Sequence, residues 1–243
     1  MIGKTQEEFI FYTNKADTID DLFLIYEKKM ADIGFNRVLF GLVNDHPTLK
    51  KEAEIGIFRN YPNSWMKHYQ EQDYEKIDPV IDWIKKGKDI FTWDEINNTK
   101  SFSKKQKKIL NEARDAELFQ GVGFTLHGHG AALAGIGAAS TERNIDLHPI
   151  ILNYARLLSI QFYTCFWALM RKESNLATIT LSLREQEVLK WIAKGYTQND
   201  IAERLNLSSH TVDGYIRVIK NKLDTKNITA TVILAIKMGL INI

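Results

Sequence analysis

Residues 60–83, NYPNSWMKHYQEQDYEKIDPVIDW, concentrate side chains that join a large apolar body to one polar group. Trp65 and Tyr69 lie four residues apart, so on a helix they share one face and close over one space. A buried indole N–H or phenol O–H requires a hydrogen-bond partner. Tyr61 adds a second hydroxyl, and Asp78 adds an acceptor. Aimed into one cavity, this set favours a small amide ligand with two carbonyl groups and an apolar tail.

A structural interpretation of the same residues stays open. Asp78 and Pro79 form a typical helix start, in which an aspartate N-cap precedes proline at the first helical position. Trp65, Trp83 and Trp93 are also typical of an apolar core. From the residue types alone, a binding site and a capped aromatic core remain alternatives.

Capping and periodicity predict the elements that must position these side chains. A capped amphipathic helix follows Thr18, and residues 37–43 and 54–58 are rich in the branched and aromatic side chains of strands. Further helices are predicted over 63–72, 79–86, 103–118 and 148–172, and two glycine-rich strands over 121–140. This order predicts an α+β fold, in which an antiparallel sheet packs between helices as an α-β-α sandwich.

Composition narrows the class of protein. The 243 residues carry a formal net charge of +2 and are 44% hydrophobic, which excludes a disordered chain or a coat of basic charge. The single cysteine, Cys165, excludes an intramolecular disulfide framework and a multi-cysteine metal site. The first residues lack the apolar run of a signal peptide. The apolar stretch 150–170 contains Asn153, Arg156 and Gln161, so we expect a buried helix in a cytoplasmic protein with no membrane partner.

A change in composition predicts two domains. Residues 171–180, RKESNLATIT, have no clear period and contain small polar side chains. We therefore predict an N-terminal domain over 1–172, a linker over 173–180 and a C-terminal domain over 181–243. The last range has nine lysine and arginine residues against six acidic ones, which by itself is weak support for nucleic-acid binding.

The C-terminal domain has clear helix signals. Ser182 and Glu185 form a capping box, and Gly195 ends the first helix. A short helix over 198–205, a tight turn and a third helix after Ser208 predict an all-α, four-helix, helix-turn-helix domain that ends in a fourth helix at 229–238. The polar face of the third helix carries the candidate DNA-binding residues Ser209, His210, Thr211, Asp213, Arg217 and Lys220.

Three basic side chains of this helix suit contacts with DNA. Arg217 suits a base edge or a phosphate, whereas Lys220 and Lys222 suit phosphates. The structural alternative is a solvated charged face. The order of capping box, apolar stripe, glycine stop and tight turn favours the DNA-binding interpretation.

Two motifs resemble a known family. Residues 181–223 carry LxxRExEVLxxIAxG and IAxxLxLSxxTV, and they resemble the DNA-binding module of the LuxR family. The spacing WxxxY(x)8DP, with Trp93 and Gly121 further on, resembles the autoinducer-binding domain of quorum-sensing LuxR-type regulators over 18–170. GFNRVLFGLV, NYPNSWMKHY and TLHG are most similar to receptors of the LasR type. The resemblance implies a ligand-responsive transcription factor whose ligand is an N-acyl-L-homoserine lactone.

The resemblance also implies roles for individual residues. Trp65 would donate to the lactone carbonyl, Asp78 would accept from the ligand amide, and Tyr61 would donate to the acyl carbonyl. Tyr69 and Trp93 would line the site and pack against the acyl chain and the ring of the ligand. The remaining expected lining residues are Leu39, Gly41, Val43, Ile55, Ile57, Ile109, Ala113, Leu133 and Gly137.

Three departures from the family pattern bear on specificity. Relatives often carry Ser or Thr near Gly137, and the small side chains of AALAGIGAAS predict room for a long acyl chain. Relatives often carry Lys, Arg or Asn at Asp213 and Gly214, which leaves the base preference open.

The implied mechanism links ligand binding to DNA binding. A bound ligand would stabilise the N-terminal domain, and a homodimer formed through 148–172 and the last helix would bind an inverted repeat in double-stranded promoter DNA. RNA polymerase is a candidate partner. No cofactor is expected.

Two alternatives remain at this point. The first is a LuxR-type regulator that responds to a different small molecule or to none. The second is a metalloenzyme, because His127 and His129 would share a face of a strand. The sequence has no further cluster of His and Asp ligands beside them, so neither a metal site nor a catalytic residue is predicted.

Overall fold

The structure is a computed structural model that describes residues 2–49, 51–173 and 179–242. The chain divides into two compact units, and each is described by itself. Residues 174–178 of the predicted linker lie outside the described ranges, so the boundaries 1–172, 173–180 and 181–243 stay predictions.

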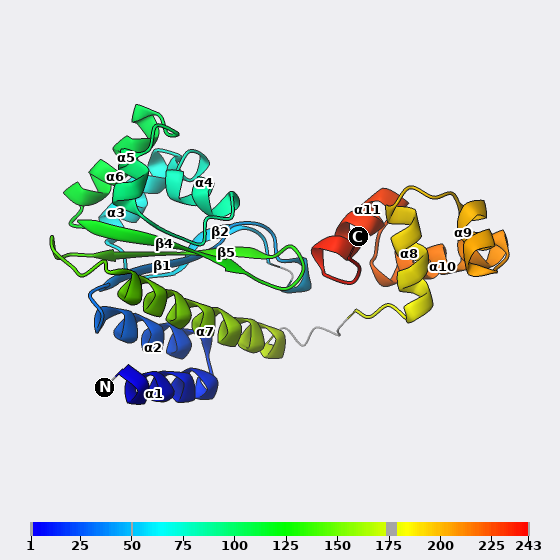
Figure 1. Ribbon diagram of the computed structural model, residues 1–243, viewed down its shortest axis with the longest axis horizontal. Coiled ribbons are helices and arrows are strands. Elements are labelled where there is room, and N and C mark those ends of the chain that lie inside the picture. Colours follow the sequence, from blue (N-terminus) through cyan, green and yellow to red (C-terminus); the bar gives the residue numbers. More distant parts are fainter. Residues whose placement is uncertain (1, 50, 174–178, 243) are drawn as a thin grey trace. The chain divides into compact units, whose positions relative to one another are not determined.

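A five-stranded antiparallel sheet forms the centre of the N-terminal unit, with the order β2-β1-β5-β4-β3 (Figure 1). The strands are β1 (Arg37–Leu42), β2 (Glu54–Arg59), β3 (Ile90–Thr92), β4 (Gln120–His127) and β5 (Leu133–Ser140). The predicted glycine-rich pair is the β4–β5 hairpin, which pairs without interruption from Gln120 and Ser140 to His127 and Leu133.

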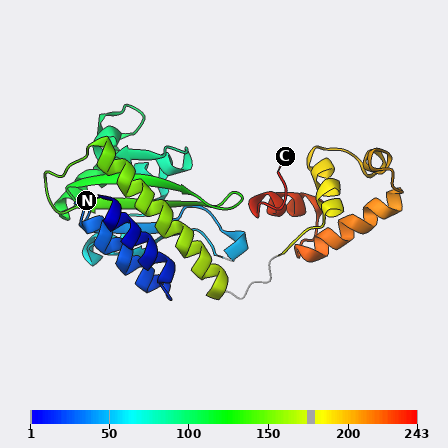
Figure 2. The same cartoon turned by 60° about the horizontal axis from the view of Figure 1, so that its bottom comes forward.

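Helices cover both faces of this sheet (Figure 1). Helices α2 (Ile19–Ala31) and α7 (Pro149–Glu173) form one layer, and α1 (Ile2–Lys15) packs on the side of these two helices that faces away from the sheet (Figures 1 and 2). The other layer contains α3 (Asn63–Glu71), α4 (Pro79–Lys85), α5 (Trp93–Asn98) and α6 (Lys104–Asp115). Single 3-10 turns occur at Pro47–Leu49 and Tyr74–Lys76. The predicted α-β-α sandwich is confirmed.

Because side chains alternate along a strand, the two faces of β1 contact different layers of helices. Phe40 faces the α2–α7 layer, where its ring lies 5.2 Å from the ring of Phe162 and 4.9 Å from that of Phe166. Its neighbours Leu39 and Gly41 lie on the opposite face, beneath α3 and α4. One face therefore supplies a packed aromatic core, and the other supplies the floor of the site described below.

Three elements were not predicted from the sequence: α1, β3 and α5. Helix α1 mixes charged with apolar residues, and β3 is only three residues long. Helix α5 begins with a capping box, in which Thr92 accepts from the backbone of Glu95 and Glu95 accepts from the backbone of Thr92. Strand β3 and helix α5 are too short for a periodic pattern to stand out, and the charged residues of α1 obscure its apolar face.

The C-terminal unit is the predicted four-helix domain: α8 (Leu183–Ala193), α9 (Gln198–Leu205), α10 (Ser209–Lys222) and α11 (Ile228–Lys237). The capping box of Ser182 and Glu185 is present, and Gly195 has φ +88° where α8 ends. Asn206 adopts the left-handed conformation in the tight turn that joins α9 to α10. Among the described residues, no helix is both long and apolar enough to cross a membrane.

Candidate ligand pocket and nucleic-acid interface

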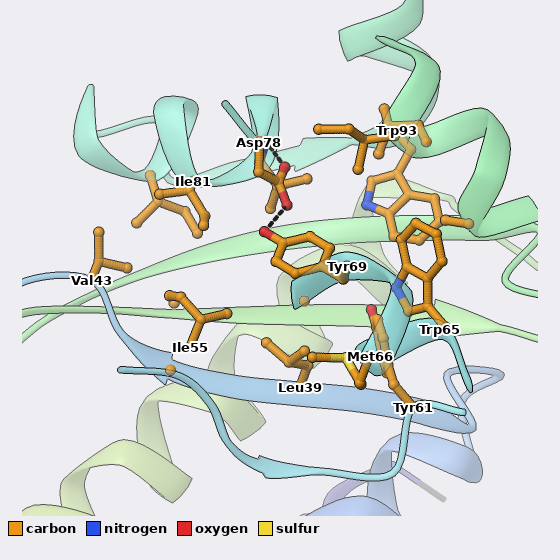
Figure 3. A pocket seen from close by; sticks show the side chains of 18 residues that line it. Leu39, Val43, Ile55, Tyr61, Trp65, Met66, Tyr69, Asp78, Ile81 and Trp93 are labelled. Atoms are coloured by element: carbon orange, nitrogen blue, oxygen red, sulfur yellow. Dashed lines mark hydrogen bonds between the residues drawn. The ribbon is translucent and has the colours of Figure 1, made fainter. Parts of the chain in front are cut away.

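A cavity lies in the N-terminal unit between the sheet and the layer of α3 to α6 (Figure 3). It is lined by Leu39, Gly41, Val43, Ile55, Tyr61, Trp65, Met66, Tyr69, Asp78, Val80, Ile81, Ile84, Trp93, Ile109, Leu110, Ala113, Gly135 and Gly137. Most of these side chains are apolar. The polar groups come from a few residues on α3, α4, α5 and the segment before α3.

The structure brings nearly all of the expected lining residues to this cavity; Ile57 and Leu133 are the exceptions. Strand alternation placed Ile57 beside Ile55, but the β1–β2 register shifts between Phe40 and Leu42. Gly56 also adopts φ +75° there, which breaks the alternation. Leu133, at the first position of β5, packs against the surrounding apolar cluster without reaching the cavity.

Six lining residues were not predicted: Met66, Val80, Ile81, Ile84, Leu110 and Gly135. Gly135 had a usable signal, because it alternates with Gly137 along one strand face. The three α4 residues follow the Asp78–Pro79 helix start, but the face that α4 turns to the cavity depends on tertiary packing.

Asp78 makes two hydrogen bonds at the cavity wall. Its Oδ1 accepts from the backbone N–H of Val80 at 2.7 Å, as the N-cap of α4. Its Oδ2 accepts from the hydroxyl of Tyr69 at 2.7 Å, across from α3 (Figure 3). Burial raises the pKa of Asp78 above 3.8, although the bonds from Tyr69 and from the backbone of Val80 and Ile81 lower it.

Tyr61 and Trp65 supply donors at the same cavity. Within the described part of the chain, neither the Tyr61 hydroxyl nor the Trp65 indole forms a hydrogen bond. Burial raises the pKa of Tyr61 and of Tyr69 well above 10, so both hydroxyls stay protonated at neutral pH. A Cβ at Gly137 would lie 3.3 Å from the Tyr61 oxygen, which places this hydroxyl directly over the β5 backbone.

Trp93 closes one end of the cavity and lies on the backbone of β4. A Cβ added at Gly121 would overlap the Trp93 indole, so only glycine permits this approach. The indole is 5% exposed, and its Nε1 makes no hydrogen bond to any residue that the structure describes. Trp93 thus adds a buried donor to a site where packing alone was expected of it.

A polar cluster outside the cavity lining packs against Trp65 and Tyr69; it consists of His68, Tyr74, Lys108 and Glu112. The ring of Tyr74 lies 6.4 Å from that of Trp65 and 5.8 Å from that of Tyr69. The Tyr74 hydroxyl donates to Glu112 on α6, which also bonds to His68 at 3.0 Å and pairs with Lys108 at 2.9 Å. Although burial alone would raise the pKa of Glu112, these bonds lower it to about 2. The cluster links α3 to α6 outside the cavity lining.

In the C-terminal unit, α10 presents the polar face that the sequence predicts. Ser209, His210, Thr211 and Arg217 are exposed, whereas Asp213 and Lys220 are partly buried. Asp213 forms an ion pair with Arg217 at 2.9 Å, one helical turn away. Asp213, the acidic residue that departs from the family pattern, is therefore paired with Arg217, the arginine that suits DNA contact.

Lys222, for which a phosphate contact is predicted, forms an ion pair within the C-terminal unit. Its Nζ lies 2.8 Å from Glu185 Oε2 and 3.2 Å from the carbonyl oxygen of Thr180. Glu185 is buried, and its Oε2 also accepts from the backbone N–H of Ser182 at 2.6 Å. Lys222 thus joins the end of α10 to the start of α8, and its contact with phosphate stays a prediction.

His127 and His129 form no larger cluster. Within the residues described, there is no group of three or more His, Cys, Asp or Glu side chains placed to hold a metal ion.

A ligand cavity in an α-β-α sandwich, combined with a helix-turn-helix domain, defines a DNA-binding regulator that responds to a small molecule. Comparison with known proteins agrees with this class. Residues 18–165 match the family described as the autoinducer binding domain, and residues 179–235 match the bacterial regulatory proteins of the luxR family. The chain therefore belongs to the LuxR family of quorum-sensing transcriptional regulators, which are not enzymes.

Relatives are similar along most of the chain. The transcriptional activator protein ExpR of Dickeya dadantii is 30% identical over 243 residues, covering 94% of both chains. The quorum-sensing regulator RhlR of Pseudomonas aeruginosa is 26% identical over 230 residues, covering 90% of this chain and 89% of RhlR. The chain spans only 62% of the length of a third relative, the putative regulator y4qH of Sinorhizobium fredii.

The fold also matches a solved structure. SdiA of Escherichia coli superimposes with a TM-score of 0.77 at 21% identity and covers 99% of both chains. At this identity the match concerns the fold alone.

Proposed function

We propose that this regulator binds an N-acyl-L-homoserine lactone in the cavity of its N-terminal unit and, as a homodimer, binds an inverted repeat in promoter DNA. One observation carries the ligand part of the proposal. An apolar cavity has an aspartate acceptor and several buried or partly buried N–H and O–H donors on its wall, including groups with no partner in the described chain. Leaving such groups unpaired is costly, and a ligand with matching polar groups removes that cost.

Each polar part of the ligand has a complementary residue. Asp78 accepts from the amide N–H, Trp65 donates to the lactone carbonyl, and Tyr61 donates to the acyl carbonyl. The bond from Tyr69 holds the Asp78 carboxylate in place for this contact. The acyl tail packs on the apolar walls formed by residues such as Val43 and Ile81.

Small residues on β5 bear on the length of that tail. Gly135 and Gly137 line the cavity with no side chain. A Cβ at Gly137 would meet the Tyr61 hydroxyl alone, whereas the Ile84 side chain fills the space over Gly135. The room beside Gly137 favours a long or bent acyl chain. A series of chain lengths whose affinity increased toward four carbons would contradict this preference.

Ligand binding and folding are coupled in this proposal. A ligand that binds only the folded state stabilises it by RT ln(1 + [L]/Kd), which is about 2.7 kcal/mol at a concentration of 100 Kd. The cavity lies among most of the apolar residues of α3 to α6, so the ligand would complete part of the core.

An exposed apolar stripe supports the homodimer. On α7, Ile150, Leu157 and Ile160 are exposed at spacings of seven and three residues, on one side of the helix. Exposed apolar patches of this kind mark surfaces that pair with another protein. Two-fold pairing would present two α10 helices to the two halves of an inverted repeat. RNA polymerase remains a candidate further partner.

The ligand part is tested by expression with and without a panel of acyl-homoserine lactones of different chain length. The protein is then purified, and bound small molecules are identified by mass spectrometry of an organic extract. We expect one lactone to be retained and the soluble yield to rise in its presence. Soluble protein that retains none of them would contradict the proposal.

The DNA part is tested by the variant Arg217→Ala in the lactone-bound protein. We expect the loss of sequence-specific binding with ligand retention unchanged. Arg184→Ala, which removes an exposed arginine of α8 paired with Glu187, is the matched control. Equal operator binding by both variants would show that α10 does not read the site through Arg217.

A second candidate ligand is an acylglycerol. SdiA in complex with octanoyl-rac-glycerol has a solved structure that matches this chain with a TM-score of 0.75 at 22% identity. A glycerol hydroxyl donates to a carboxylate as an amide N–H does, so Asp78 suits either head group. Including monoacylglycerols in the panel separates the two candidates.

A further inference from the structure

The buried indole N–H of Trp93 is the polar group that the proposed ligand contacts leave unexplained. Trp93 is 5% exposed, and its Nε1 makes no hydrogen bond with the described residues. A buried donor without a partner is disfavoured, so native structures rarely keep one without a reason. Trp93 lines the cavity, and its indole nitrogen points inward (Figure 3). A bound molecule that displaces the protein atoms now covering Nε1 can therefore reach this donor.

Two features fix the direction of this N–H. The indole lies against the backbone of Gly121, where even a methyl group would overlap its ring. Trp93 is also the first residue of α5, whose start is fixed by the capping box of Thr92 and Glu95. The donor is therefore held in one orientation, as a preorganised binding group requires.

The position of Trp93 shows which part of a ligand it faces. Trp93 and Trp65 lie at one end of the cavity, and their indole nitrogens both point inward (Figure 3). Val43 and Ile81 lie at the opposite end, with Asp78 and Tyr69 between (Figure 3). An amide that donates to Asp78 therefore directs its apolar tail toward Val43 and its head group toward the two tryptophans.

We infer that Trp93 is a second head-group donor, whose N–H bonds to an oxygen of the lactone ester. This inference rests on the proposed function and refines the ligand class to acyl amides whose head group carries an ester-type oxygen. An ester offers a carbonyl oxygen with two lone pairs and a ring oxygen, enough for both Trp65 and Trp93. Trp93 then selects for head-group oxygen, in addition to packing on the ligand.

Spectroscopy of the unaltered protein gives a first test. The chain has five tryptophans, so 15N-labelled indoles give five N–H signals, assigned by single Trp→Phe variants. Two complexes are compared: one with an N-acyl-homoserine lactone, and one with the N-acyl cyclopentylamide of the same chain, which lacks both ring oxygen and carbonyl. We expect the Trp93 indole proton to move downfield in the lactone complex relative to the cyclopentylamide complex. An identical Trp93 signal in both complexes would overturn the inference.

Binding selectivity gives the second test. In the wild-type protein we expect the lactone to bind more tightly than the cyclopentylamide, and Trp93→Phe to reduce this ratio by about three- to tenfold, the effect of one neutral hydrogen bond. Trp83→Phe is the control, because Trp83 packs against Phe91 and Phe102 outside the cavity lining. A ratio that stays unchanged in Trp93→Phe would assign Trp93 to packing alone.

The outcomes separate this inference from the proposed function. One outcome is that both compounds bind, while the Trp93 signal is the same in the two complexes and Trp93→Phe leaves the selectivity ratio unchanged. In that case the proposed lactone receptor stands, and the inference of a second donor is wrong. If neither compound binds the wild-type protein, the proposed function fails, and the inference fails with it.

Discussion

The hydroxyl of Tyr69 donates to Asp78 Oδ2 at 2.7 Å, while the other oxygen of the same carboxylate caps α4 through the N–H of Val80. Asp78 therefore caps the start of α4 and faces the cavity with the same side chain. The contact ties α3 to α4, so the wall of the cavity and the position of its acceptor are set together. A helix cap and a ligand contact are compatible here because a carboxylate has about four acceptor sites.

The affinity for ligand should depend on pH through Asp78. Burial raises its pKa above 3.8, so Asp78 favours the folded state while protonated, and that contribution is lost as the pH rises through the folded pKa. A ligand N–H prefers the ionised carboxylate, so affinity should rise over the same interval. In the wild-type protein the hydrogen bond from Tyr69 lowers the pKa of Asp78. We therefore expect Tyr69→Phe to raise this pKa and to move the midpoint of the affinity profile to higher pH.

This pH dependence is checked by measuring the Kd of the lactone from acid to neutral pH for three proteins. Asp78→Asn should bind weakly and without this transition, since a hydrogen bond to a charged group contributes about 1.5–3 kcal/mol. A Tyr69→Phe profile whose midpoint stays in place or falls would contradict the expectation.

Replacing Gly121 with alanine should displace Trp93. The added methyl group has no space beside the indole, and overpacking of this kind costs about 1–3 kcal/mol. We expect a lower Tm for the N-terminal unit and weaker ligand binding, both measured on the full chain. Gly214→Ala is the control, because a Cβ there meets nothing within 4 Å, and the variant should gain about 0.8–1 kcal/mol of helix stability. Equal Tm changes in both variants would show that the Gly121 contact is unimportant.

Glu112→Gln should destabilise the layer that covers the cavity. The bonds from Tyr74, His68 and Lys108 lower the pKa of Glu112 to about 2, so its stabilisation is complete above pH 4.5 and is lost as the pH falls from there toward about 2. We expect the free energy of unfolding to fall by about 1–3 kcal/mol at neutral pH, because hydrogen bonds to the neutral glutamine are weaker than those to the carboxylate.

The difference between wild type and Glu112→Gln should shrink as the pH falls below 4.5, as measured by urea unfolding. Glu71→Gln is the control, because Glu71 forms only an exposed ion pair with Lys67 at 3.8 Å and should change stability by about 0–1 kcal/mol. A Glu112→Gln deficit that persisted at pH 2 would refute the charge-based account.

Two neighbouring lysines of α10 should respond in different ways to alanine. Lys222 compensates the buried Glu185, so Lys222→Ala should lower the Tm of the C-terminal unit. Lys220 makes no such ion pair in the described residues, and Lys220→Ala should weaken DNA binding and reduce the slope of log K against log salt by about 0.9. Measuring Tm and salt dependence for both variants checks this. The reverse assignment of effects would show that Lys222 contacts phosphate.

The residues alone predicted the local parts of this protein. Capping boxes such as Ser182 with Glu185, the glycine stop at Gly195 and the α4 start at Asp78 were predictable because cap and partner lie within three residues. The sandwich and the helix-turn-helix domain followed from the order of such elements. Most of the lining was also foreseen, because strand alternation and the resemblance to a family indicate which residues face inward.

Only the tertiary structure decided contacts between residues far apart in the chain. Trp93 meets Gly121 because β4 lies beside α5. Lys222 forms an ion pair with Glu185 across 37 positions, a contact that the sequence pattern did not predict. Ile57 does not line the cavity, because a register shift alters the strand alternation. Ile84 does line it, because α4 is rotated so that this side chain faces the cavity. Register and helix rotation are set by packing across the whole sheet, and a local pattern of residues does not contain that information.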